Sequence, residues 1–213
     1  MKTLIVNASS KSKREYVEET FSYSSKPFHS QLSKNHSSAL IAARENLLEQ
    51  VKISIGPDIA QGIADPKDDE YLPAFLRYSG RTYSKITDAA WRSLTANNNY
   101  DLIILSALYG LVGYNDPVRN YQIRQDTKLI ASTIGNFWRD AGAKDWLLNY
   151  IENGSFKRVY FVLSTSYSKI IQKDNLIKEL TDMGIQAEDK QMVSKGMVSM
   201  LERGSFINNF LLS

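Results

Sequence analysis

The sequence predicts an α/β fold, with a mostly parallel central sheet flanked by helices. Short apolar runs rich in β-branched and aromatic residues alternate along the chain with longer stretches in which apolar residues recur at helical spacing. Several of these runs end in small polar residues, where strands of an open α/β sheet present their carboxyl edge to ligands. Strands separated by helices are typical of a parallel sheet covered on both faces.

Four segments are predicted as strands. They are Thr3–Asn7, Asp101–Ser106, Val159–Ser164 and a fourth within Gly184–Lys190. The first three are short and almost continuously apolar, as central strands are when helices cover both faces.

Helical spacing of apolar residues predicts the elements between and after the strands. The predicted helices are Ser38–Lys52, Tyr83–Thr95, Thr127–Ala141, Trp146–Ile151, Asn175–Met183 and Met197–Leu212. Ser37 or Ser38 is the expected N-cap of the first helix, Asp126 is the expected N-cap of the third, and Gly184 ends the fifth.

The remaining segments are predicted as loops. Residues 11–37, rich in Ser, Lys and aromatic residues, form a long loop or a partly helical insertion. Gly56-Pro57 ends the first helix, and Asp65-Pro66 begins an acidic turn. We find no internal repeat and no low-complexity linker, so residues 1–213 are expected to form a single domain.

Composition is that of an ordinary globular protein and narrows the chemistry. With 43% hydrophobic and 23% charged residues, wholesale disorder is not expected. No apolar run approaches the ~18 residues of a membrane span, and the start is too short for a secretory leader, so we expect a cytoplasmic protein without a membrane partner. The net charge of +3 permits a polyanionic partner.

Several catalytic and cofactor classes lose their support. There is no cysteine, which excludes disulfides, thiolate nucleophiles and cysteine metal sites. The two histidines, His29 and His36, lie in a Ser-rich stretch, so no metal site is expected, and a Ser-His-Asp triad would have to recruit one of them. The glycine motifs of dinucleotide-binding and P-loop folds are absent, and no cofactor is predicted.

Hydroxyl groups and cations follow the first strand. Ser9, Ser10 and Lys11 follow Asn7 after a single residue, Ala8, a pattern that can hold a phosphate group. A solvated turn explains it equally well. Gly196, after Lys195 and ahead of the last helix, can cradle a phosphate group through backbone N–H groups, and a simple loop at the helix start explains it equally well.

The stretch from Leu105 to Leu129 interleaves aromatic residues with cations. Tyr109 and Tyr121 can stack on nucleic-acid bases, at roughly 1–3 kcal/mol for each base, while cations bind phosphates. Each tyrosine taken alone is better explained as a packing residue of the loop. Asp116 precedes Pro117, which alone is typical of a turn.

The same stretch resembles a known family. Leu105-Ser106-Ala107-Leu108-Tyr109-Gly110-Leu111 is similar to the strand end L-S-G-L-Y-G-L-L of the YaaA family, the peroxide-stress (DUF328-type) proteins. Further elements of the family pattern fall in register at Asp116, Tyr121, Thr127-Lys128-Leu129 and Phe137-Trp138, with upstream and late echoes at Ser79-Gly80 to Tyr83 and at Lys195-Gly196-Met197. The chain departs from the pattern at Arg124, where an acidic residue is usual, at Asp126 in place of glycine, and throughout its N-terminal third.

The resemblance implies an α/β fold with a basic cleft, association with DNA and a role in protection from DNA damage. Domains of this family are also similar in layout to uracil-DNA-glycosylase-type folds, and relatives are associated with DNA-base modification and phage conflict. These are analogies at the level of the fold.

The leading hypothesis is a DNA glycosylase-like hydrolase that excises a base, foremost a modified one, in DNA damage or antiphage defence. Such a reaction has an oxocarbenium-like transition state, which one carboxylate can stabilise without a cofactor. In this hypothesis Asp116 is the catalytic carboxylate, Asn7 reads the base, and Tyr109 and Tyr121 stack on it. Phosphate groups are bound by Ser9, Ser10, Lys11, Arg81, Arg124, Lys128 and Lys195.

Two alternatives remain open. The chain is a non-enzymatic DNA-binding protein of stress protection, or a hydrolase that processes free nucleotides or nucleosides. The first predicts salt-dependent binding to DNA without an abasic product. The second predicts activity on mononucleotides in the absence of DNA.

Overall fold

A five-stranded sheet forms the centre of the computed structural model, which describes residues 1–15, 26–55 and 71–213. The strand order is β4-β3-β1-β6-β7. The strands are β1 (Thr3–Ala8), β3 (Tyr100–Ser106), β4 (Gly110–Gly113), β6 (Arg158–Val162) and β7 (Gln186–Asp189). Four of them run parallel, and β4 folds back antiparallel to β3. The predicted mostly parallel α/β fold is therefore confirmed.

The middle strand, β1, sets the register of the sheet. Ile5 lies opposite Leu102 of β3 on one side and Tyr160 of β6 on the other. Leu4, Ile5 and Val6 have no exposed surface. A continuous apolar run of this kind is what a parallel strand covered on both faces requires.

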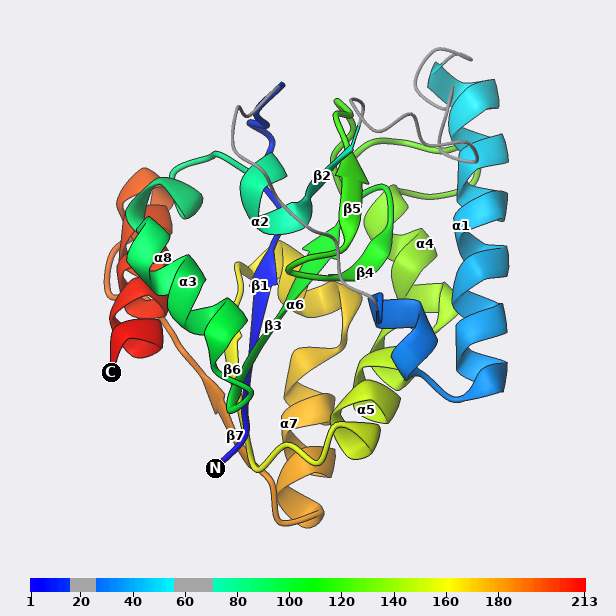
Figure 1. Cartoon of the computed structure of the whole chain (residues 1–213). Helices are drawn as coiled ribbons and strands as arrows, with labels where there is room; N and C mark the ends of the chain where they lie inside the picture. The colour runs from blue at the N-terminus through cyan, green and yellow to red at the C-terminus, as the bar shows by residue number, and fades with distance from the viewer. Residues whose placement is uncertain (16–25, 56–70) are drawn as a thin grey trace.

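Helices form a layer on each side of the sheet (Figure 1). One layer holds α1 (Lys34–Ile55), α4 (Ile134–Ala141), α5 (Ala143–Asn153), α6 (Thr165–Ile170) and α7 (Lys173–Asp182). The other holds α3 (Asp88–Ala96) and α8 (Gly196–Leu212), which pack on each other. No helix in the described ranges has the length and apolarity needed to cross a membrane.

A second, two-stranded sheet lies beside the carboxyl end of the main one (Figure 1). It pairs β2 (Tyr71–Pro73) with β5 (Pro117–Arg119), and α2 (Ala74–Arg77) follows β2 directly. The loop after β1 runs antiparallel to the residues that follow α2, with a β-bridge between Lys13 and Tyr78. None of these short elements was predicted from the sequence.

Several predicted helix boundaries are wrong. The helix expected from Thr127 begins only at Ile134, where Thr133 is the N-cap and accepts a hydrogen bond from the backbone N–H of Asn136. Residues 127–133 form a turn instead, in which Ile130 is 74% exposed. Asp126 does not cap a helix but pairs with Arg124 at 2.7 Å.

Two earlier helices also differ from the prediction. α1 begins at Lys34, so Ser37 and Ser38 lie inside it and do not cap it. The helix predicted over residues 83–95 is divided into a short 3-10 turn at Tyr83–Lys85 and α3, whose N-cap is Thr87. Within the predicted insertion at residues 11–37, the described part holds one 3-10 turn, Phe28–Gln31. The breaks at Gly56-Pro57 and Asp65-Pro66 lie outside the described residues.

Candidate functional site

A cleft of about 870 Å³ lies at the carboxyl ends of β1 and β6. After β1, the next strand of the main sheet is its neighbour on one side, β3, whereas the chain leaves β6 towards β7 on the opposite side. Such a reversal of direction leaves a crevice between two strand ends, the usual ligand site of open α/β sheets. The main chain around this cleft comes from the ends of β1 and β6, the loop at residues 79–84, the segment 123–125 and α8.

Asn7, at the end of β1, lines the floor of the cleft. Its side chain is buried (2% exposed), and Nδ2 has no hydrogen-bond partner among the described residues. A buried amide without a partner costs free energy, roughly 1–3 kcal/mol, and native structures seldom tolerate one without a reason. Asn7 therefore has a donor at the bottom of the cleft that makes no hydrogen bond of good geometry, although it lies close enough to the Tyr83 hydroxyl to act against the rise in the pKa of that phenol.

Two phenols border the same floor. The Tyr83 hydroxyl donates to the backbone oxygen of Ala8 at 2.9 Å, and the Tyr167 hydroxyl lies 3.2 Å from the Ser9 hydroxyl. Burial raises the pKa of both phenols, that of Tyr167 to about 12, so both stay protonated at neutral pH. They are hydrogen-bonding walls of the cleft.

The loop after β1 is held in place by a lysine and a glycine. Lys13 Nζ donates to the backbone oxygens of Ser10 and Lys11 and lies 3.8 Å from the ring centre of Tyr121. A Cβ on Gly80 would lie 2.0 Å from Ser10 Oγ, so any larger residue there would force the Ser10 side chain to turn aside. Burial, and then the neighbouring Arg77, lower the pKa of Lys13 to about 8.

The cleft is electropositive. Lys11, Arg81, Arg124 and Arg203 line it, whereas the described lining residues include no Asp or Glu. Arg124 pairs with Asp126, and the other three have no ion pair within the described ranges. No group of three His, Asp or Glu residues in those ranges is placed to hold a metal ion. The cleft is suited to binding an anion.

A buried network supports the cleft from the end of β3. The Ser106 hydroxyl lies 2.8 Å from the Tyr121 hydroxyl and accepts from the Tyr78 hydroxyl at 3.2 Å. The two phenols also contact each other at 2.9 Å. Burial raises the pKa of both, so the network is neutral. Tyr121 is thereby a packing residue with its hydroxyl inside the protein.

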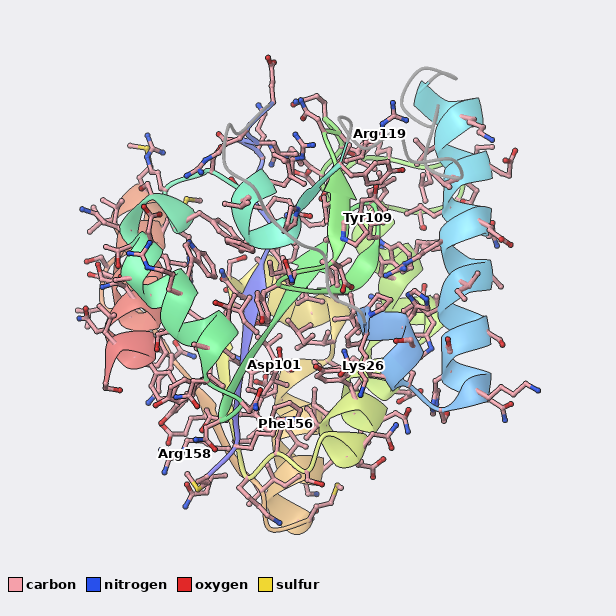
Figure 2. All side chains as sticks on the ribbon, viewed as in Figure 1. Lys26, Asp101, Tyr109, Arg119, Phe156 and Arg158 are labelled. Atoms are coloured by element: carbon pink, nitrogen blue, oxygen red, sulfur yellow. The ribbon has the colours of Figure 1, made fainter. Side chains whose placement is uncertain are left out.

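Asp116 is not in the cleft. It lines a separate cavity of about 330 Å³ together with Arg44 of α1 and Tyr109. Tyr109 lies between the sheet and α1 (Figure 2). Its carboxylate accepts from the backbone N–H groups of Gly113 at 2.9 Å and Phe28 at 3.0 Å. Burial raises the pKa of Asp116, and these hydrogen bonds, with the Arg44 charge, act in the opposite direction. The structure thus places Asp116 and Asn7, the two residues of the hypothetical catalytic site, in separate cavities, with Asp116 beside Tyr109 and Arg44.

The predicted stacking residues are also buried. Tyr109 is 7% exposed and Tyr121 is 4% exposed, and their rings contact each other edge-on at 6.0 Å between centres. The Tyr109 hydroxyl accepts from the backbone N–H of Arg119. Neither ring presents a face to the cleft, because both complete the core.

The predicted phosphate-binding residues divide into three groups. The structure brings five of them together with Asn7 around the cleft, namely Ser9, Ser10, Lys11, Arg81 and Arg124. Lys195 lines a neighbouring hollow of about 970 Å³. Lys128 belongs to the turn before α4, where its backbone forms an antiparallel β-bridge with Thr133. It lines none of the three cavities.

The cleft also holds residues outside the site predicted from the sequence, among them Ser164, Tyr167 and Arg203. One signal was present, because the Ser164-Thr165-Ser166 ending of the third predicted strand repeats the Ser9-Ser10 ending of the first. No sequence pattern indicated Arg203, since it lies in the middle of a helix and reaches the cleft only through tertiary packing.

Comparison with known proteins identifies the family. The model of the family "Peroxide stress protein YaaA" matches residues 1–212. Among curated relatives, a UPF0246 protein of Rickettsia felis is 23% identical over 181 residues, covering 80% of this chain and 71% of the relative. A UPF0246 protein of Fusobacterium nucleatum is 26% identical over 141 residues, covering 65% of this chain and 55% of the relative. The chain therefore belongs to the YaaA peroxide stress protein family, as a divergent member.

Proposed function

We propose that this protein binds DNA in the cleft at the carboxyl ends of β1 and β6. The single observation that carries the proposal is the charge of the lining. Lys11 and Arg81 have no ion pair within the described ranges, no carboxylate lines the cleft there, and Asp189 and Glu202 attract Arg203 only from beyond ion-pair distance. Phosphate oxygens are the ligands that such a set of cations and neighbouring serine hydroxyls recognises.

The floor of the cleft favours a nucleotide whose base is unpaired. The orphan Nδ2 of Asn7 is a donor for a ring nitrogen or carbonyl oxygen of a base, as amides are in base recognition. Tyr83 and Tyr167 supply further hydroxyl groups beside it. These groups lie in a recess, which a base reaches only in a single strand or after leaving the duplex.

The test is the salt dependence of DNA affinity. Wild type, Lys11→Gln and Arg81→Gln are compared by fluorescence anisotropy across a salt series, with Lys157→Gln as control. Lys157 directly precedes β6. Its neighbours Phe156 and Arg158 lie at the end of the sheet opposite the cleft (Figure 2). Each cleft variant is expected to lower the slope of log K against log salt by about 0.7–0.9. Affinity that does not change with salt or with these substitutions would refute the proposal.

Excision of the bound base is the second candidate function. The observation that favours it is the unpartnered Asn7 amide, which can stabilise charge on a departing base. Because Asp116 lines another cavity, the carboxylate of a glycosylase mechanism has no counterpart among the described residues of the cleft. The catalytic contribution is thus limited to stabilisation of the leaving group and of the distorted nucleotide.

Mass spectrometry of bases released from modified phage DNA tests the excision. Release that is lost in Asn7→Ala and retained in Asp116→Asn supports excision in the cleft. Intact DNA with all substrates leaves binding as the function. Release from mononucleotides alone would instead support the nucleotide-processing alternative.

A further inference from the structure

A second hollow adjoins the cleft. It has a volume of about 970 Å³ and is bordered by α6, α7, the end of β7 and the start of α8. Ser164, Met200 and Arg203 line both hollows. The two hollows therefore adjoin at these three residues, and together they are called the joined groove below.

The second hollow carries unpaired cations of its own. Lys169 and Lys195 are exposed and have no ion pair within the described ranges. The acidic residues of its lining, Asp174 and Asp189, both lie within ion-pair distance of Lys173. Lys169 and Lys195 are thus left free to bind an anion, whereas Lys173 and Arg139 of the same lining are paired.

Arg203 stands at the junction. Its Nη1 donates to Ser199 Oγ at 3.4 Å, and its buried Nε has no partner among the described residues. The adjacent Gly204 places α8 against the loop beside the cleft, because a Cβ there would lie 2.0 Å from the backbone oxygen of Thr82. A guanidinium with an unused donor is thereby fixed between the two hollows.

Two methionines line the second hollow among these cations. Met200 of α8 is 43% exposed and lines both hollows, and Met192 lines the second one. Apolar groups next to free cations can contact a ligand that is both anionic and partly apolar. A nucleic-acid strand has these properties when its bases are unpaired, since both its phosphates and its base faces are then available.

We propose that the joined groove binds single-stranded nucleic acid along its length, with Arg203 contacting the phosphate at the junction and Lys169 and Lys195 binding those beyond it. The proposal rests on the function proposed above and extends it to the form and length of the ligand. A duplex is read by convex elements that enter its grooves, whereas a concave, cationic groove with a donor at its floor suits a single strand.

The experiment measures affinity against strand length. Fluorescein-labelled oligothymidylates of about 3 and about 12 nucleotides fall near the ends of the ~4–16-nucleotide site sizes of single-strand-binding folds. They are titrated with wild type, Lys169→Gln/Lys195→Gln, Lys11→Gln and the control Lys157→Gln. A duplex of the longer length is titrated in parallel. Both substituted lysines of the second hollow are exposed, so the double variant is expected to fold.

The groove predicts an effect that depends on length. The double variant should bind the long strand about 10-fold more weakly and the short strand as wild type does, whereas Lys11→Gln should weaken both. Equal affinity of the double variant and wild type for the long strand overturns the groove and leaves the proposed function intact if Lys11→Gln still weakens binding. Loss of effect in Lys11→Gln as well overturns both. Tighter binding of the duplex overturns the single-strand assignment.

Discussion

Asn7 is the residue whose environment most clearly separates function from stability. Its amide is buried at the end of a central strand, yet Nδ2 has no partner within the described ranges. Ser106, at the equivalent end of β3, is equally buried but contacts the hydroxyls of both Tyr78 and Tyr121. Two buried polar side chains at neighbouring strand ends therefore have opposite roles, one open to a ligand and the other fixed by the core.

Replacement of the two residues should give opposite results. Asn7→Leu removes an unsatisfied donor at similar volume, so the free energy of unfolding should stay unchanged or rise, while strand affinity falls about 10-fold or more. Ser106→Ala should lower the free energy of unfolding by about 1–2 kcal/mol because it removes one hydrogen-bond partner from each of two buried phenols, which then have only each other. Urea denaturation and anisotropy measure both quantities. A strongly destabilised Asn7→Leu with unchanged affinity would show that the amide is structural.

Lys13 gives a pH dependence with a defined sign. Its pKa is about 8 in the folded protein and 10.5 in the unfolded chain, so the unfolded chain binds more protons between these values. The free energy of unfolding should therefore rise with pH from about 8 to 10.5. At ~1.4 kcal/mol for each pKa unit, and reduced by partial exposure of the side chain, the gain is about 2 kcal/mol.

Comparison with Lys13→Met isolates this effect. The other titrating groups are common to both proteins, so the difference between their stabilities across the pH series reports Lys13. Wild type should gain on Lys13→Met as the pH rises through this window. A difference that stays flat from pH 8 to 10.5 would show that Lys13 has an ordinary pKa.

Asp116 should act on stability alone. Its carboxylate joins the turn after β4 to Phe28 through two backbone N–H groups. Asp116→Asn replaces one acceptor oxygen with a donor, which should lower the free energy of unfolding by about 1–3 kcal/mol. Strand affinity, measured where both proteins are folded, should not change. A loss of affinity at unchanged stability would show that Asp116 belongs to the functional site.

At the scale of elements, α8 positions one wall of the groove. Gly204 allows it to approach the loop at Thr82, and Asn208 Oδ1 accepts from the backbone N–H and the hydroxyl of Thr87, the N-cap of α3. The helix thus contacts both the loop beside the cleft and the helix that follows it. Its placement determines where Arg203 lies relative to β1.

Gly204→Ala tests this packing. The new Cβ would meet the backbone oxygen of Thr82 and the Cβ of Lys85, which cannot both move aside, so a cost of about 1–3 kcal/mol is expected together with weaker strand binding. Asn209→Ala, at an exposed position of the same helix, should be neutral. Thermal denaturation of the three proteins distinguishes the two cases, and a fully stable Gly204→Ala would contradict the close approach.

The elements also show what a sequence can predict. β1, β3 and β6 were predictable because strands buried on both faces are continuous apolar runs. The helix predicted from Thr127 failed because Ile130 and Ile134 have helical spacing, although a turn capped by Thr133 exposes the first of them. Short pairs such as β2 with β5 join segments far apart in the chain and have no local pattern.

The candidate site was predictable only in part. Ser9, Ser10 and Lys11 follow a strand that the sequence identifies, and the rule for open sheets places them at the cleft. The role of Asp116 was not accessible, because its partner Phe28 lies 88 residues away in the sequence. Arg203 was not accessible either, since its position depends on how α8 packs.

At the scale of the whole molecule, a modest net charge is unevenly distributed. The chain carries only +3 in total, yet the described linings of the cleft and the adjoining hollow contain several cations without an acidic partner. Concentrated positive charge in a concave surface attracts a polyanion more strongly than the net charge suggests. The arrangement of the sheet produces this concentration, because β1 and β6 end side by side.

Photo-crosslinking of a single strand that contains 5-bromodeoxyuridine tests the central claim most directly. The crosslinked peptides, identified by mass spectrometry, report where the strand lies on the protein. Binding in the cleft predicts crosslinks to residues 79–84 and 164–168, which carry Tyr83 and Tyr167, and to Met200 of α8. Crosslinks confined to α1 or α5, neither of which lines the cleft, would contradict it.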